Sequence, residues 1–142
     1  ELPHVAEPVA SYVPAVRSAG QIHVSGQLPM CEGQLLAQGK VPDDVTLDQA
    51  QAAARQCVLN GLAAVHRELA GDWSQFTRLV RLGVYVNSAA GFTEQHKVAN
   101  GASELIGQAL GQAGVHARAA VGATALPLNA PVEIELLATV SD

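Results

Sequence analysis

Charged residues are scarce in this chain of 142 amino acids. Asp, Glu, Lys and Arg make up 15% of it and hydrophobic residues make up 49%, whereas about 25% of a typical soluble domain is charged. So little polar surface favours an oligomer over a monomer. A chain of this length buries roughly two-thirds of its unfolded surface on folding, which is enough for one core. We therefore expect a single domain over residues 1–142.

Long apolar runs and clusters of positive charge are also missing. No run approaches the ~18 apolar residues of a membrane span, and residues 1–4 have neither the basic start nor the apolar stretch of a secretory signal. With 8 Lys and Arg against 13 Asp and Glu, the formal net charge is −5, and the arginines are scattered singly. These features exclude a membrane protein and argue against nucleic acid as the main partner.

The sequence contains no metal-binding or redox motif. Cys31 and Cys57 have no metal or redox spacing, so we interpret both as reduced thiols that pack as small buried hydrophobic residues in a cytoplasmic protein. The five histidines include no His-x-His or His-x-x-x-His pair on an expected element. We expect no metal.

The first third of the chain predicts a β-hairpin and a long loop. Residues 12–17 and 21–27 read as two extended segments around a turn that contains glycine. Pro14 has no N–H to donate, so the first strand is expected at a sheet edge. Proline, glycine and aspartate then mark a loop over residues 28–45, with a short strand near residues 34–37.

Two helices and a further strand are expected next. Thr46 and Gln49 have the spacing of a capping box, and the apolar positions that follow step by three and four residues. This pattern predicts a helix of about six turns that ends near residues 70–71. Residues 76–87 alternate as a strand with β-branched and aromatic content. Thr93 is positioned to cap a second helix that ends in glycines.

Residues 117–126 and 132–140 are expected to form a closing β-hairpin. The order is therefore β-β-α-β-α-β-β, an α+β fold in which two helices cover one face of one mixed sheet. In the last strand, Glu133, Glu135 and Leu137 point to the other face. Left bare, that face would be a large exposed patch of acids and apolar groups, so covering it with copies of the chain fits the low charge content.

The residues that could carry chemistry each have an ordinary explanation when taken singly. Arg118 opens a strand of small residues, where a surface arginine in an ion pair is the commoner role. Glu133 could be a solvated strand acid, and Tyr12 a lid on the core with its hydroxyl in water. Ser25 and Gly26 could be a simple strand end.

Together, these positions resemble a known family. The chain has Ser11-Tyr12 before the first strand, Val24-Ser25-Gly26-Gln27-Leu28-Pro29 closing the second, Arg118 after the second helix, and Leu126-Pro127 followed by Val132-Glu133-Ile134-Glu135. In this order and approximate spacing they resemble the Rid family, the reactive intermediate deaminases also known as YjgF-type or L-PSP proteins. The resemblance covers nearly the whole chain. It is closest to a branch marked by starts similar to Ser11-Tyr12-Val13-Pro14 and by the segment Lys97-Val98-Ala99-Asn100-Gly101-Ala102-Ser103.

The resemblance implies a chorismate-mutase-like homotrimer, with its three sheets facing inward and its sites in the clefts between subunits. Members similar to the deaminases hydrolyse enamines and imines, such as 2-aminoacrylate, to a 2-keto acid and ammonia without a cofactor. On that pattern Arg118 grips the substrate carboxylate, and Glu133 positions or activates the water. The pocket would be lined by Tyr12, Ser25, Gly26, Asn100 and Ala120, with the backbones of Gly26 and Ala120 as hydrogen-bonding groups.

The chemistry independently suits these residue types. A guanidinium takes a carboxylate with two parallel hydrogen bonds, and a carboxylate within reach of a water accepts its proton as the water attacks carbon. Because the substrate is already reactive, orientation and one base suffice without a metal, a nucleophile or a cofactor. The chain departs from the family pattern at Ala120, where many members have cysteine. This change leaves the arginine clamp in place, removes any thiol role and bears on substrate preference.

Two other functions remain open from the sequence. One is a non-catalytic or regulatory trimer that binds a small carboxylate or a protein partner through the same clefts. The other is RNA cleavage, which an older family label suggests and the acidic balance disfavours. The presence of both Arg118 and Glu133 favours the enzyme, because a binder needs only the arginine.

Strand arithmetic predicts a site that is shared between chains. In the expected closing hairpin, Glu133 lies across from about Thr124, and Arg118 lies further along the same strand. At about 3.3 Å per residue, Arg118 and Glu133 are roughly 20 Å apart within one subunit. If they serve one pocket, they come from neighbouring subunits.

Overall fold

The fold comes from a computed structural model, which describes residues 1–8 and 10–141 of the chain. Along these residues four strands precede the first α-helix, and three strands and a second α-helix follow, with three short 3-10 helices (η). The elements are β1 (Ala15–Ser18), β2 (Gln21–Gln27), β3 (Met30–Cys31), β4 (Gln34–Leu35), α1 (Leu47–Glu68), η1 (Trp73–Gln75), β5 (Phe76–Asn87), α2 (Gln95–Leu110), η2 (Gly111–Gly114), β6 (Ala117–Ala123), η3 (Pro127–Asn129) and β7 (Val132–Val140).

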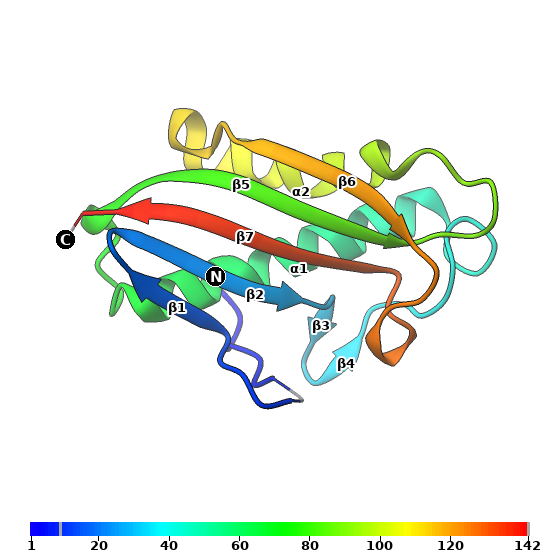
Figure 1. Cartoon of the computed structure of the whole chain (residues 1–142), viewed down its shortest axis with the longest axis horizontal. Helices are drawn as coiled ribbons and strands as arrows, with labels where there is room; N and C mark the ends of the chain where they lie inside the picture. The colour runs from blue at the N-terminus through cyan, green and yellow to red at the C-terminus, as the bar shows by residue number, and fades with distance from the viewer. Residues whose placement is uncertain (9, 142) are drawn as a thin grey trace.

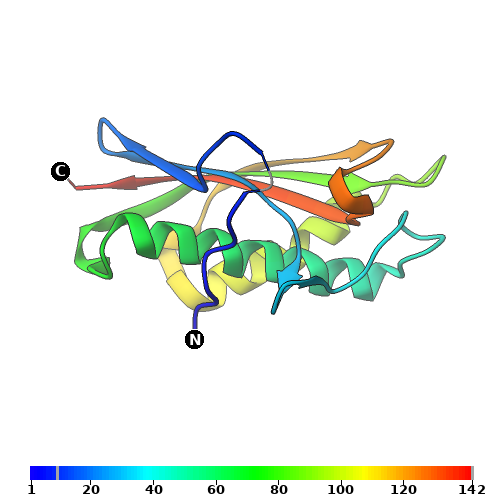
Figure 2. The same ribbon diagram turned by 90° about the horizontal axis from the view of Figure 1, so that it is seen from below.

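Five strands form one mixed sheet in the order β1-β2-β7-β5-β6 (Figure 1). Strands β5 and β6 pair in parallel, and the other neighbours pair antiparallel. Figure 2 shows that both helices lie on one face of this sheet and leave the other face uncovered. The predicted mixed sheet with two helices on one face is therefore confirmed.

The predicted closing hairpin between β6 and β7 is wrong. Strand β5 lies between them, because Leu82 of β5 pairs with Arg118 of β6 on one side and with Leu136 of β7 on the other. The cause is the connection through α2: a helical crossover after a strand returns the chain to a parallel neighbour, which places β6 beside β5. The loop that contains η3 then carries the chain past the end of β5 to β7.

The first hairpin and the start of α1 form as predicted. Ala15 pairs with Val24, and β1 is an edge strand, as Pro14 requires. At the start of α1, the Gln49 backbone N–H donates to the Thr46 hydroxyl at 3.1 Å, and the Thr46 backbone N–H donates to the Gln49 side chain at 2.9 Å. This reciprocal pair satisfies two N–H groups that the helix itself leaves free.

Two local predictions need correction. Thr93 does not cap α2, because the helix begins after Glu94, whose carboxylate pairs with Lys97 at 3.1 Å. Cys57 is buried in α1 as expected, but Cys31 is exposed. The reason is its position in the two-stranded β3–β4 ribbon, which is separate from the main sheet. The predicted short strand near residues 34–37 corresponds to β4.

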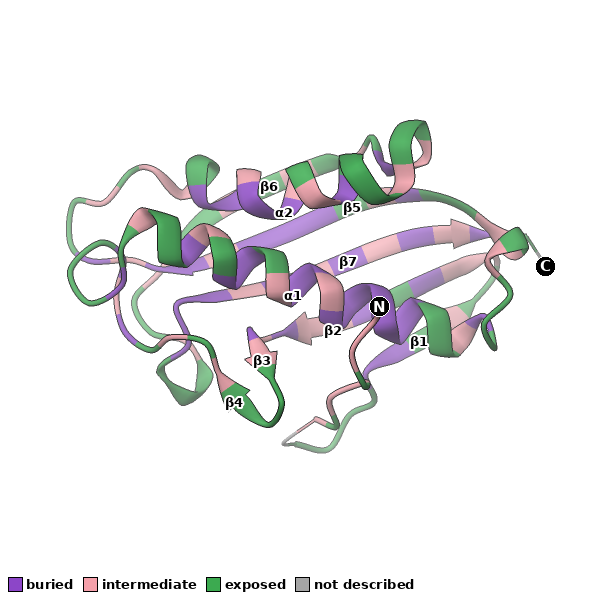
Figure 3. Ribbon diagram, turned by 180° about the vertical axis from the view of Figure 1, so that it is seen from behind, coloured by how far each residue is buried: buried purple, intermediate pink, exposed green. Residues whose placement is uncertain are grey.

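The core lies between the helices and the sheet, where Figure 3 shows the buried positions. Strand β7 alternates between buried residues on the helix side and half-buried residues on the uncovered side. The uncovered side carries apolar groups as well as acids: Val16 is 53% exposed and Val121 is 47% exposed. We call this side the bare face. Neither α-helix in the described part of the chain is long and apolar enough to cross a membrane.

Candidate active site

Arg118 extends from β6 to α2 and is held there by three hydrogen bonds. Its Nη2 donates to Asn100 Oδ1 at 2.8 Å and to the His96 backbone oxygen at 3.1 Å. Its Nη1 donates to Ser103 Oγ at 2.9 Å. A guanidinium carries five N–H donors, so within the described chain these bonds leave two donors for a ligand. The structure thus brings the predicted residues Arg118 and Asn100 together.

Ser103 and His116 complete this group, which we call the arginine cluster (Asn100, Ser103, His116 and Arg118). The Ser103 hydroxyl lies 2.9 Å from His116 Nε2, and His116 Nδ1 lies 2.6 Å from the Gly114 backbone oxygen. Sequence reasoning assigned neither residue a role. The sequence does place Ser103 beside the predicted residue Asn100, because residues 96, 100 and 103 have the i, i+4, i+7 spacing of one helix face. No comparable signal marks His116, which lies just before β6.

Ala120 lies two residues beyond Arg118, on the same side of β6, and packs partly buried against the core. Strand β6 is the last strand of the sheet and pairs only with β5 among the described residues. Every second residue of such an edge strand turns its backbone N–H and C=O away from the sheet. The edge therefore offers backbone hydrogen-bonding groups near the arginine cluster, and a backbone role for Ala120 stays a prediction.

The other predicted residues gather on the bare face at the opposite part of the sheet. Glu133 of β7 is half-buried there and lies directly against Gly26 of β2. A Cβ atom on Gly26 would overlap Glu133 Oε1, so only glycine leaves room for the carboxylate in this position. The β2–β7 register shifts between Val24 and Gln27, which indicates a β-bulge at this point. Bulges often redirect side chains next to active sites.

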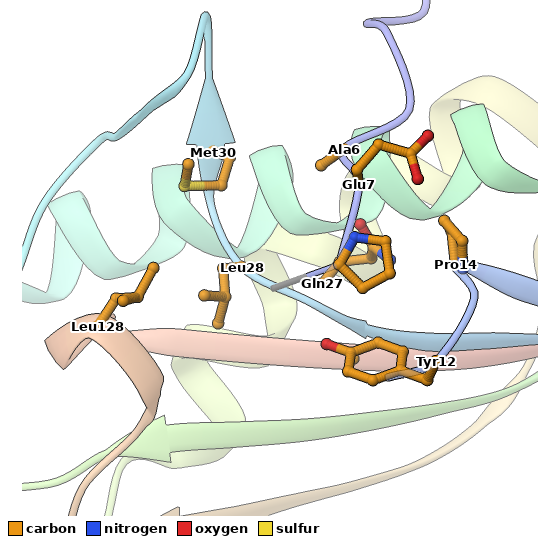
Figure 4. A pocket seen from close by; sticks show the side chains of 10 residues that line it. Ala6, Glu7, Tyr12, Pro14, Gln27, Leu28, Met30 and Leu128 are labelled. Carbon is orange, nitrogen blue, oxygen red and sulfur yellow. The ribbon is translucent and has the colours of Figure 1, made fainter. Parts of the chain in front are cut away.

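Ser25 and Tyr12 extend this group, which we call the glutamate cluster (Tyr12, Ser25, Gly26 and Glu133). The Ser25 hydroxyl donates to the Val13 backbone oxygen at 2.7 Å, which ties the bulge to the segment before β1. Tyr12 is 49% exposed. Together with Gly26, it lines a pocket of about 80 Å³. Figure 4 shows the mainly apolar side chains around this pocket, among them Leu28, Met30 and Leu128.

Electrostatics single out Glu133 among the carboxylates of the bare face. Burial, and secondly the negative charge of Glu135, raise the pKa of Glu133 above its ordinary value. Glu135 itself accepts a hydrogen bond from the Tyr85 hydroxyl at 3.0 Å and lies 3.7 Å from Arg81 Nη1. Desolvation and a like charge both disfavour a carboxylate. A carboxylate whose pKa is raised in this way holds a proton more readily and is suited to general base and acid chemistry.

The two clusters do not meet within one chain. Arg118 pairs with Leu82 of β5 and Glu133 with Tyr85, so they are separated by two strand spacings and three residues. With strands about 4.8 Å apart and residues about 3.3 Å apart along a strand, their Cα atoms are roughly 14 Å apart. Arg118 also points toward α2, whereas Glu133 lies on the bare face. The predicted hairpin geometry was therefore wrong, but the two residues are still too far apart to contact one small ligand.

The comparisons with known proteins match the whole of this architecture. The family described as "YjgF/chorismate mutase-like, putative endoribonuclease" matches residues 1–140. Protein TCP17 of Trypanosoma cruzi is 44% identical over 138 residues, which cover 96% of this chain and 86% of that protein. The crystal structure of Atu1372 from Agrobacterium tumefaciens, a protein of unknown function, is 46% identical, with a TM-score of 0.90 over 92% of this chain and 83% of that one. A "putative endoribonuclease" from Shewanella oneidensis is 33% identical, with a TM-score of 0.93 over 98% of this chain and 91% of that one. In sequence and in fold, the chain belongs to the YjgF/chorismate mutase-like family.

Proposed function

We propose that this protein hydrolyses reactive enamines and imines similar to 2-aminoacrylate, giving a 2-keto acid and ammonia without a metal or a cofactor. It acts as a cytoplasmic homotrimer of single-domain subunits. In each cleft, the arginine cluster of one subunit faces the glutamate cluster of the next. The observation that carries the proposal is the separation of two complementary half-sites. One offers free guanidinium donors, and the other offers a half-buried carboxylate with a raised pKa.

The reaction needs one cation and one base. Arg118 holds the substrate carboxylate by its positive charge and one of its two free N–H donors. These donors, on Nε and Nη1, point away from each other because α2 occupies both protons of Nη2. This contact fixes the imine carbon in place.

An enamine first takes up a proton at its methylene carbon and loses one from nitrogen, which gives the imine. Glu133 accepts a proton from the water as its oxygen attacks the imine carbon. Glu133 passes the water proton to the imine nitrogen, which gives a carbinolamine. Transfer of the hydroxyl proton to the same nitrogen, again through Glu133, accompanies the breaking of the carbon–nitrogen bond; the electron pair leaves with the nitrogen, ammonia is released and the keto acid remains. Gly26 gives the carboxylate room to approach, and the pocket beside Tyr12 accepts the rest of the substrate.

The activity is tested most simply with imines made in the assay. Fresh 2-aminoacrylate or branched-chain imines are incubated with the protein, and the release of keto acid or ammonia is timed against buffer. We expect release to be faster than in buffer and proportional to protein concentration. Equal rates with and without protein would contradict the proposal and leave the carboxylate binder as the better function.

The family description also mentions an endoribonuclease. RNA cleavage is less consistent with this chain, because its formal net charge is −5 and a protein that binds a phosphate backbone usually presents clustered Lys and Arg. The same protein preparation should be incubated with single-stranded RNA. We expect no protein-dependent cleavage.

A charge placed on the bare face is expected to break the assembly. Leu137 is half-buried in the middle of β7 and points to this face. In a trimer built on the bare face, an aspartate at this position would have to give up its hydration, and its register partners Arg81 and His23 offset only part of that cost. We expect Leu137→Asp to dissociate or unfold the assembly, as measured by light scattering at micromolar concentration. Arg55→Asp, on the exposed side of α1, is the control and should stay assembled. A stable wild-type monomer would contradict the trimer.

A methyl group at Gly26 is expected to impair catalysis without unfolding the chain. The new Cβ would displace the Glu133 carboxylate, and small misplacements of reacting groups cost up to about 100-fold in rate. The end of the glutamate side chain can turn away, so the fold tolerates the change. We expect Gly26→Ala to lower kcat by about 10- to 100-fold. Ala52→Val adds methyl groups at an exposed position of α1 and should keep full activity. Full activity of Gly26→Ala would argue against a role for Glu133.

The raised pKa of Glu133 predicts a pH dependence with a definite sign. A general base must be ionised, so kcat should fall as the pH drops through a pKa that lies above the ordinary value of glutamate. Glu135→Gln removes the neighbouring negative charge, which lowers the pKa of Glu133. We therefore expect the acid limb of the kcat profile to move to lower pH in Glu135→Gln and to stay in place in Glu32→Gln, which alters an exposed residue of the β3–β4 ribbon. A shift to higher pH would contradict this assignment.

A further inference from the structure

A continuous chain of hydrogen bonds runs from the backbone of η2 to the guanidinium of Arg118. It begins at the Gly114 carbonyl, passes through His116 and Ser103, and ends at Arg118 Nη1, with links of 2.6, 2.9 and 2.9 Å. We call this series of hydrogen bonds the relay. It joins three elements, because Gly114 belongs to η2, Ser103 to α2 and Arg118 to β6. The function proposed above uses Arg118 but gives no role to His116 or Ser103.

The Gly114 carbonyl, at the start of the relay, determines which group donates in each of its hydrogen bonds. A carbonyl oxygen only accepts, so His116 Nδ1 must carry the proton that lies between it and Gly114. In a neutral imidazole the other nitrogen, Nε2, is then an acceptor. The Ser103 hydroxyl has one proton and must donate it to Nε2. The Ser103 oxygen is left with its lone pairs, and it accepts from Arg118 Nη1.

From this geometry we propose that His116 and Ser103 are positioning residues that orient Arg118 for the substrate carboxylate. The inference rests on the proposed function, in which Arg118 grips that carboxylate. Arginine is long and flexible, so holding its guanidinium in one place before binding removes part of the entropic cost of binding. Hydrogen bonds in a series also polarise one another, which makes the Ser103 oxygen a stronger acceptor for the guanidinium. The relay therefore acts on substrate binding and leaves the chemical step largely unchanged.

The tautomer of His116 tests the relay in the wild-type protein without any substitution. Long-range ¹H–¹⁵N spectra of the imidazole distinguish a protonated Nδ1 from a protonated Nε2. At a pH where the ring is neutral, we expect a protonated Nδ1 and a bare Nε2 for His116. The Nε2-protonated tautomer would overturn the proposal, because Ser103 would then have to accept from the ring.

The kinetics of variants test whether Ser103 helps Arg118 to bind the substrate. Losing a hydrogen bond to a charged group corresponds to about 10- to 100-fold in binding, so we expect Ser103→Ala to raise KM about tenfold or more, with kcat within about threefold of wild type. Ser103→Thr keeps a hydroxyl and should restore the wild-type KM. Glu104→Ala, an exposed neighbour on α2, should have no effect. A wild-type KM in Ser103→Ala would overturn the inference while leaving the proposed function standing.

His116→Phe should raise KM to the same extent as Ser103→Ala, and the double variant should be no worse than either single one. Substitutions of residues that act through the same hydrogen bonds have non-additive effects in this way. Additive effects would show that His116 does not act through Ser103.

The mobility of the arginine gives a readout that is independent of turnover. The Nη protons of an immobilised guanidinium give separate NMR signals, whereas rotation averages them. We expect separate signals for the two Nη1 protons of Arg118 in wild type and averaged Nη1 signals in both Ser103→Ala and His116→Phe, while Nη2 stays bonded to Asn100 and His96. Separate signals in all three would overturn the inference. If wild type hydrolyses no imine but shows the expected tautomer and immobilised arginine, then the proposed function fails and the relay stands as a device that holds Arg118.

Discussion

Arg118→Ala is expected to lower kcat/KM for imine hydrolysis by about 10²-fold, because it removes the positive charge and the charge-assisted hydrogen bond that hold the substrate carboxylate. The alanine should leave the fold intact. Arg118 is only partly buried, and three of its hydrogen bonds are made to the surface of α2 and not to the core. Steady-state kinetics with an imine substrate, together with light scattering on the same sample, separate loss of catalysis from loss of assembly.

Lysine is expected to recover little of this loss. In the structure, Arg118 serves three acceptors on α2 and still has two N–H donors. An ammonium has three donors in all, so Arg118→Lys cannot both replace the three bonds to α2 and bind a carboxylate. Arg55→Ala removes an exposed arginine from α1 and is the matched control. Full activity in Arg118→Ala would remove Arg118 from the site.

Local patterns predicted the elements well where the chain itself carries the signal. The bounds of β5 and β7 follow from two-residue alternation, and the start of α1 follows from the pair Thr46 and Gln49. The pairing of β6 could not be predicted in the same way. Alternation marks a segment as a strand but does not identify its neighbour, and the short connection before β7 favoured a hairpin. The crossover through α2 decided the pairing instead.

The candidate site was predictable only in part. The resemblance to the Rid family singled out Arg118, Asn100 and Glu133, but it could not show how Arg118 is held. That depends on which side chains of α2 face β6 and on the orientation of His116, which only tertiary structure fixes. The reason for glycine at position 26 could not be predicted from the sequence either. It became clear once the bulge had placed Gly26 against the Glu133 carboxylate.

Glu133→Gln is expected to have the second large effect. Loss of a general base costs about 10²- to 10⁴-fold in rate, so kcat should fall by that factor. Because the pKa of Glu133 is higher in the folded chain than in the unfolded chain, its ionisation lowers the free energy of unfolding as the pH rises through that pKa. At neutral pH the neutral glutamine therefore removes a destabilising charge from the subunit. We expect the variant to unfold at a temperature no lower than wild type, which excludes unfolding as the cause of its inactivity.

The claim that each site is shared between two subunits is tested most directly by mixing the two inactive proteins. Arg118→Ala and Glu133→Gln trimers are combined in equal amounts under conditions that exchange subunits, and native mass spectrometry confirms the exchange. Every mixed trimer then contains one cleft in which an intact Arg118 faces an intact Glu133. Random assembly makes about three-quarters of the trimers mixed and restores roughly a quarter of the wild-type activity. Confirmed exchange with no recovered activity would contradict the shared site.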